Sequence, residues 1–126
     1  MRAVDTNLLV RLIARDDVAQ LASAEAFISR GAWVSILVLA ETSWVLATVY
    51  DLEHEEIATV VEMLLNHDHL TLQDADVVAA ALARYRAAPA PGFSDCLVLE
   101  IARKAGHLPL GTFDKRLAKA DGAERV

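Results

Sequence analysis

The chain has 126 residues, which suits one domain, and 55% of them are hydrophobic, enough to bury a sizeable core. No apolar run approaches the ~20 residues of a membrane span, and a lone cysteine, Cys96, excludes an internal disulfide. The formal net charge of −6 argues against simple electrostatic attraction to nucleic acid or anionic lipid. With no visible signal peptide, we expect a reducing, cytoplasmic location.

The first half of the chain is predicted to alternate short strands with longer helices. Residues 3–4 form a short buried strand, after which Thr6 and Asn7 can cap a helix over 8–14. A strand is expected at 33–35. Apolar spacing and helix stop signals predict three further helices, at 16–30, 36–49 and 53–66.

The second half continues the alternation. It is predicted to contain a strand at 70–72, a helix at 74–87 and a loop at 89–92. Ser94 can then cap a helix over 95–105, a strand follows at 108–112, and Asp114 opens a last helix through 120. Short apolar strands between helices are typical of an α/β fold with a parallel sheet covered by helices on both faces. We expect a single domain over 1–126.

Three acidic residues are predicted to lie at one edge of this sheet. Asp5 and Asp114 each follow a strand, and Asp95 lies in the first turn of a helix, which starts at the same edge. In open α/β sheets, ligands bind at the carboxyl ends of the strands. Each acid taken alone has a purely structural explanation as a helix cap or as a charge opposite the helix dipole. Their shared placement favours a functional site.

Glu41 is the fourth candidate, because it lies on a strongly apolar helix. Leu37 and Val38 precede it by one turn, and Trp44 and Val45 follow by one turn. A glutamate on such a face is costly to bury without a partner, so it either binds a cation or pairs with a nearby Lys or Arg at the rim.

Four converging carboxylates require compensation. Two of them ~4 Å apart repel by about 4 kcal/mol at an effective dielectric of 20, so the group either takes up protons or binds a cation. Oxygen ligands of this kind suit Mg²⁺ or Mn²⁺.

The remaining candidates have simpler interpretations. Lys115 and Arg116 belong to the only clustered basic charge, which serves either as a solvated helix face or as a phosphate contact beside Asp114. His67 and His69 lack an evident third metal ligand. Cys96 is expected to be a buried small apolar residue. Both tryptophans, Trp33 and Trp44, are expected in the core.

Four segments together resemble the PIN-domain ribonucleases, in particular the toxin half of a VapBC-type toxin–antitoxin pair. They are Val4-Asp5-Thr6-Asn7-Leu8-Leu9, Leu39-Ala40-Glu41, Phe93-Ser94-Asp95 and Gly111-Thr112-Phe113-Asp114, and their order matches across nearly the whole chain. The resemblance implies a central sheet flanked by helices, with Asp5, Glu41, Asp95 and Asp114 around Mg²⁺ or Mn²⁺ and with Thr6, Asn7 and Thr112 supporting those ligands. Arg116 stands where some relatives carry a further acid.

The implied reaction is the hydrolysis of an RNA phosphodiester by a water that an acid such as Asp95 helps to deprotonate. The resemblance also implies a homodimer and an antitoxin that blocks the acidic groove, and the apolar helices between residues 36 and 65 are the expected surfaces for both. Three alternatives stay open. They are a PIN nuclease for RNA processing or maturation, an aspartate-based phosphotransferase, against which Asn7 counts, and a catalytically silent binding module.

Overall fold

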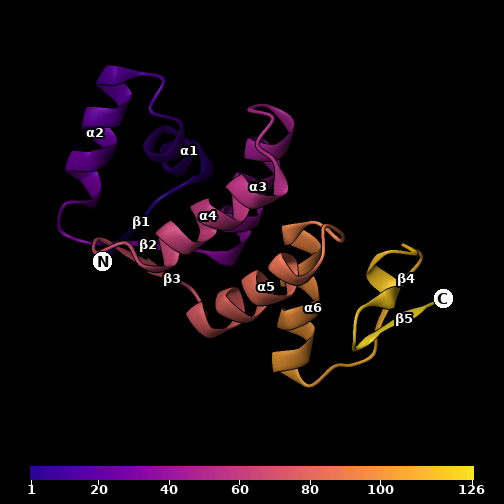
Figure 1. Cartoon of the computed structure of the whole chain (residues 1–126). Helices are drawn as coiled ribbons and strands as arrows, with labels where there is room; N and C mark the ends of the chain where they lie inside the picture. Colours follow the sequence, from indigo (N-terminus) through magenta and orange to yellow (C-terminus); the bar gives the residue numbers. More distant parts are fainter.

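The computed structural model describes all 126 residues and has an α/β fold of six α-helices and short parallel strands (Figure 1). The first half contains β1 (Arg2–Ala3), α1 (Thr6–Ala14), α2 (Val18–Ile28), β2 (Ala32–Val34), α3 (Ile36–Thr48) and α4 (His54–Leu65). The second half contains β3 (Leu70–Leu72), α5 (Ala75–Ala87), α6 (Phe93–Ala105), β4 (Leu110–Thr112), the one-turn 3₁₀ helix η1 (Leu117–Lys119) and β5 (Ala123–Arg125). The predicted fold class is confirmed.

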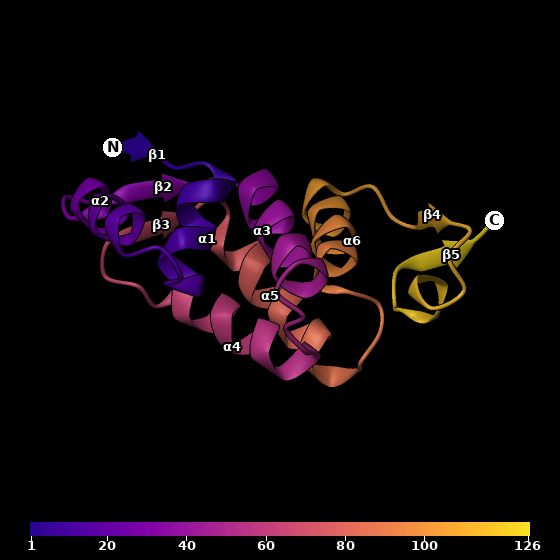
Figure 2. The same ribbon diagram turned by 90° about the horizontal axis from the view of Figure 1, so that it is seen from above.

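The strands form two separate parallel sheets instead of one. β1, β2 and β3 pair in that order, with Ala3 opposite Trp33 and Ala32 opposite Leu70. β4 pairs only with β5. Figure 2 shows the two sheets at opposite ends of the molecule, with α3, α5 and α6 between them. The expectation that the strand before Asp114 shares a sheet with the strand before Asp5 is therefore wrong within one chain.

The hydrophobic core lies between the three-stranded sheet and the helices. Leu9, Val34, Leu39, Val61 and Leu97 are almost completely buried there. The most extensive helix packing is between α5 and α6, while β4 and β5 pack mainly against each other and against η1. After Glu100, Leu117 is the only buried residue. The last fifth of the chain thus has almost no core of its own.

Side-chain caps fix where the first helices begin. Asp5 is the N-cap of α1, because its Oδ1 accepts a hydrogen bond from the Leu8 amide at 2.9 Å. The prediction that Thr6 and Asn7 cap this helix is wrong, since both lie inside it. Ser35 caps α3, which begins within one residue of its predicted start. Glu53 and Glu56 form a capping box at α4.

Several local predictions differ from the structure. β1 is exposed, and of the predicted strand at 3–4 only Val4 is buried. The N-cap of α6 is Gly92, not Ser94. Asp114 opens a turn that leads into η1 instead of a helix through 120, and β5 was not predicted. Trp44 is exposed by 63%, so only the half-buried Trp33 fits the expected core position.

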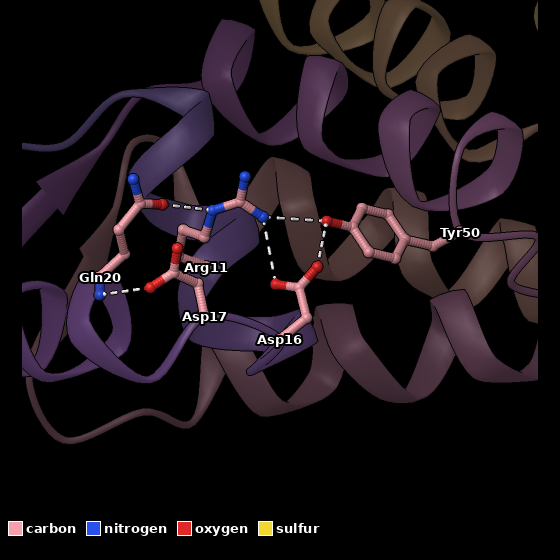
Figure 3. Close-up of polar contacts among 5 residues, drawn as sticks. All are labelled: Arg11, Asp16, Asp17, Gln20 and Tyr50. Carbon is pink, nitrogen blue, oxygen red and sulfur yellow. Dashed lines mark hydrogen bonds and ion pairs between the residues drawn. The ribbon is translucent and has the colours of Figure 1, made fainter.

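A polar cluster ties α1, the start of α2 and the end of α3 together (Figure 3). The Arg11 guanidinium donates to Gln20 Oε1 at 2.6 Å, to Asp16 Oδ1 at 3.1 Å and to Tyr50 Oη at 3.0 Å. The Tyr50 hydroxyl donates to Asp16 and is the main reason why the pKa of Asp16 is lowered. These bonds account fully for Asp16, which needs no functional role.

None of the helices has the length and apolar character needed to cross a bilayer.

Candidate functional site

The first pair of predicted acids lies where α1 and α3 meet. Asp5 directly precedes α1, and the hydroxyl of the next residue, Thr6, donates to Glu41 Oε2 at 3.2 Å. α1 packs against α3, and this contact holds the two carboxylates on neighbouring elements. Both acids are exposed, and neither forms an ion pair. Thr6 thus contacts one of the two acids, and its role in supporting metal ligands stays a prediction.

The second pair is Asp95 in the first turn of α6 and Asp114 after β4. Burial raises the pKa of the half-buried Asp95, and the negative charge of Asp114 raises it further. Asp114 itself accepts hydrogen bonds from the Leu117 and Arg116 amides, which lower its pKa. Its own amide donates to Thr112 Oγ1 at 3.0 Å. Thr112 thus fixes the turn that presents Asp114.

The structure does not bring the four acids into one cluster within a single chain. No three acidic, histidine or cysteine side chains lie close enough together to hold a metal ion. Carboxylate oxygens are the donors that Mg²⁺ and Mn²⁺ prefer, so the donor type fits such an ion. The spacing of the four acids within one chain does not fit a metal ion, because Asp114 follows a strand of the other sheet.

The environment of Glu41 differs from the one predicted. Its helix is apolar, but Glu41 is exposed, on the same outer face as Leu37 and Trp44, whose side chains are 68% and 63% exposed. Neither the expected burial nor the alternative ion pair with Lys or Arg is present. The carboxylate has no large desolvation cost and keeps an oxygen free for a ligand.

We predict that Glu41→Gln leaves the free energy of unfolding in EDTA within about 0.5 kcal/mol of the wild type, because an exposed side chain with one hydroxyl partner is replaced by a close isostere. Urea denaturation of both proteins in EDTA measures this. A loss of about 3–5 kcal/mol would instead reveal a buried ion pair that the structure lacks.

The structure separates the clustered basic residues, which are Arg103, Lys104, Lys115, Arg116 and Lys119, into two groups. Arg103 binds Glu100 and the Asp121 carbonyl, and Lys104 binds Asp74 and Asp76, so both are engaged in structural contacts. Arg116 and Lys119 instead line a cleft of about 990 Å³ together with Arg84 on α5. Sequence reasoning missed Arg84, whose only signal was its position near the predicted loop at 89–92.

Glu100, Cys96 and the pair His67 and His69 have clear structural explanations. Glu100 is buried and accepts a hydrogen bond from Arg103 Nε at 3.2 Å, with Arg84 Nε at 3.6 Å. Sequence reasoning missed it, although Arg103 three residues later was a signal. Cys96 is fully buried, which confirms the prediction of a buried small residue, and burial raises the pKa of its thiol to about 11. His67 Nδ1 accepts the His69 amide, which explains this pair as a turn.

Asp95 should also make stability depend on pH. Its folded pKa lies above the ordinary value of 3.8, so the folded state binds the proton more tightly than the unfolded chain. The stability that the folded state gains by holding this proton on Asp95 is present below pH ~4 and is lost as pH rises through the folded pKa. We predict that Asp95→Asn unfolds at the same urea concentration as wild type at pH 3 and at a higher one at pH 7. Equal urea midpoints for the wild type and Asp95→Asn at pH 7 would show that burying the ionised Asp95 carboxylate costs no stability.

Comparisons with known proteins assign the chain to a family. A family model described as PIN domain matches residues 2–123. The chain belongs to the PIN-domain family. PIN domains are generally nucleases, they typically use divalent metal ions, and membership suggests that RNA is bound. Searches of curated proteins and of solved structures give no match.

Proposed function

We propose that this PIN domain is a metal-dependent endoribonuclease that hydrolyses RNA phosphodiester bonds and is the toxin component of a type II toxin–antitoxin pair. The observation that carries the proposal is the match over residues 2–123, joined to the four acids at the family-like positions Asp5, Glu41, Asp95 and Asp114. A bound Mg²⁺ or Mn²⁺ would offset negative charge on the phosphoryl group.

Asp95 is suited to take the proton of the attacking water. A general base works best when its pKa is near the working pH, and burial shifts the pKa of Asp95 in that direction. Asp5, Glu41 and Asp114 would supply carboxylate oxygens of the type that such an ion prefers, with Asp5 and Glu41 on α1 and α3 and Asp114 after β4 of the other sheet. Thr6 and Thr112 hold two of these acids in place, and the exposed Asn7 lies beside them at the start of α1.

The basic cleft supplies a path for the RNA backbone. The net charge of −6 repels a polyanion at long range, so local positive charge is needed to hold it. Arg116 and the exposed Lys115 directly follow Asp114, and Lys119 extends the positive surface away from the acids. Arg84 also lines the cleft, but its guanidinium faces the buried Glu100.

We predict that replacing both Lys115 and Arg116 with alanine weakens RNA binding and reduces the dependence of log K on log[salt] by about 1.4, because each contact to a single-stranded phosphate contributes about 0.7. Fluorescence anisotropy over a salt series measures it. The matched control is Lys104→Ala, whose ammonium already binds Asp74 and Asp76. Equal slopes for both variants would assign Lys115 and Arg116 to an ordinary solvated surface.

The outer face of α3 supports a protein partner. Leu37 and Trp44 are exposed apolar residues on either side of Glu41, and a partner that buried them would also cover this carboxylate. An antitoxin bound there would block the acidic residues while it removed apolar surface from water.

The proposal is tested by incubating a labelled RNA with the chain in EDTA and in Mg²⁺ or Mn²⁺. We expect cleavage with either ion and none in EDTA. Expression in bacteria then separates the toxin from an RNA-processing enzyme, because a toxin arrests growth unless its antitoxin is co-expressed. Cleavage without growth arrest would favour the processing role, and absence of cleavage with both ions would overturn the nuclease assignment.

A further inference from the structure

A small cleft lies between α1 and α2 and shares no residue with the basic cleft described above. Its volume of about 350 Å³ is at the small end of the range for ligand sites, about 300–1,000 Å³, and leaves room for one planar ring system. The two helices pack against each other, and each contributes one face to the cleft. The lining residues that matter for a ligand are Asn7, Leu8 and Arg11 on α1 and Gln20, Ser23 and Phe27 on α2.

The cleft begins close to the acid at the start of α1. Asn7 lies two residues after Asp5, which corresponds to about 3 Å along a helix axis, and Arg11 lies about one turn further on. Thr6, between Asp5 and Asn7, binds Glu41 on α3. The start of α1 therefore joins the cleft to two of the candidate acids. An RNA with a phosphate at Asp5 has its neighbouring base within reach of the cleft.

The polar side of the cleft offers two hydrogen-bond donors in a fixed arrangement. Arg11 Nε donates to Gln20 Oε1 at 2.6 Å, so the amide oxygen is engaged and the amide nitrogen of Gln20 is free to donate elsewhere. Arg11 Nη1 is bound to Asp16 and Tyr50, whereas Nη2 forms no hydrogen bond within the chain. Figure 3 shows the Gln20 amide nitrogen and the unbonded Arg11 nitrogen on the same side of this cluster. Together they match a ligand with two adjacent acceptors.

The rest of the lining supplies acceptors and apolar surface. Ser23 and Asn7 are exposed and form no side-chain hydrogen bond within the chain, so their oxygens are free to accept. Leu8 and Phe27 add apolar surface. The Arg2 guanidinium already covers the Phe27 ring, 3.8 Å from its centroid, so Phe27 forms a wall of the cleft and Arg2 adds positive charge beside it. A flat ligand with apolar faces and a polar edge fits these surroundings.

We propose that this cleft binds a guanine base of the RNA substrate beside the scissile phosphate and so selects where the RNA is cut. Guanine has two adjacent acceptors, O6 and N7, which take hydrogen bonds from Arg11 and Gln20. Its N1–H and N2 amine donate to the oxygens of Asn7 and Ser23. Adenine has an amine in place of O6, and this donor would face the donating nitrogen of Gln20. The cleft therefore discriminates between the two purines.

Binding of base analogues in EDTA tests the cleft without cleavage. Labelled oligouridine tracts that carry one central guanine, adenine, inosine or 7-deazaguanine are compared by fluorescence anisotropy. We expect guanine to bind tightest and adenine about 5- to 150-fold more weakly, which is the discrimination of one bidentate pair. Inosine lacks the N2 amine and 7-deazaguanine lacks the N7 acceptor, so both should fall between guanine and adenine. Equal dissociation constants for guanine and adenine would overturn the proposal, as would competition by inorganic phosphate that ignores the base.

Gln20→Glu should reverse the preference between the two purines. Glutamate keeps an oxygen that accepts from Arg11 Nε, so the fold is retained, but it places an acceptor where the amide nitrogen was. Adenine offers a donor amine beside N7, so the variant should bind the adenine RNA at least about fivefold more tightly than the guanine RNA. The matched control is Ala19→Glu, which adds the same charge at an exposed position of α2 outside the cleft and should still prefer guanine. An unchanged guanine preference in Gln20→Glu, with unchanged circular dichroism, would overturn the proposal.

Mapping of the cut sites separates this proposal from the nuclease function, on which its placement beside the scissile phosphate rests. A mixed-sequence RNA is incubated with each protein in Mg²⁺, and the new ends are sequenced. We expect guanine at one fixed position relative to the cut for the wild type and adenine at that position for Gln20→Glu. Cleavage without a base preference near the cut would reject the guanine site and leave the nuclease proposal standing. Guanine-selective binding without cleavage in Mg²⁺ or Mn²⁺ would leave the cleft as a guanine site and reject the nuclease proposal.

Discussion

Asp5→Asn and Asp95→Asn should each lower the rate of RNA cleavage by at least about a hundredfold while the protein stays folded. For Asp5 the fold should survive because asparagine keeps the side-chain oxygen that caps α1 at the Leu8 amide. Asp95 caps no helix, and its replacement removes a half-buried charge. The loss would therefore report the chemistry of the carboxylates and not a damaged structure.

Single-turnover cleavage of a labelled RNA in Mg²⁺, with circular dichroism of each protein, measures both halves of this expectation. Asp68→Asn is the matched control, because Asp68 is exposed and forms no ion pair or side-chain hydrogen bond. It should cleave at the wild-type rate. Full activity in the Asp5 or Asp95 variant would remove that residue from the mechanism.

Glu100→Gln should produce the largest loss of stability among these variants. Its carboxylate is buried and faces the guanidinium groups of Arg103 and Arg84, so a neutral amide would deprive both positive charges of this carboxylate, and only Arg103 would keep a second partner, Asp121. Removing one member of a fully buried pair costs about 3–5 kcal/mol. Because the two arginine side chains are 34% and 26% exposed, water compensates in part, and we expect a loss of about 2 kcal/mol.

Urea denaturation of Glu100→Gln beside Glu62→Gln gives a direct comparison. Glu62 also binds an arginine, Arg86, but both side chains are about half exposed, so its replacement should cost less than about 1 kcal/mol. If both variants lost the same small amount of unfolding free energy, water would be shown to solvate Arg84 and Arg103 well enough to replace the Glu100 carboxylate.

The sequence by itself determined where the six α-helices lie. The predicted helix at 36–49 matches α3 to within one residue, and the strand at 70–72 is β3 without change. Apolar periodicity, side-chain caps and glycine stops act within a few residues of the chain, and these signals are visible in the sequence. The four segments that resemble PIN-domain ribonucleases are equally local, and all of them lie within the residues that match the PIN-domain family.

Only the tertiary structure decided which strands share a sheet and which side chains are buried. Strands of two or three residues carry little local signal, and the partners within β1–β3 lie 30 or more residues apart in the sequence, so the division between β1–β3 and β4–β5 was not visible in the sequence. Burial is decided the same way. Glu41 was expected on a buried face and is exposed, whereas Glu100 went unnoticed and is buried, because the packing of α3 and α6 against their neighbours selects the face that each helix turns inward.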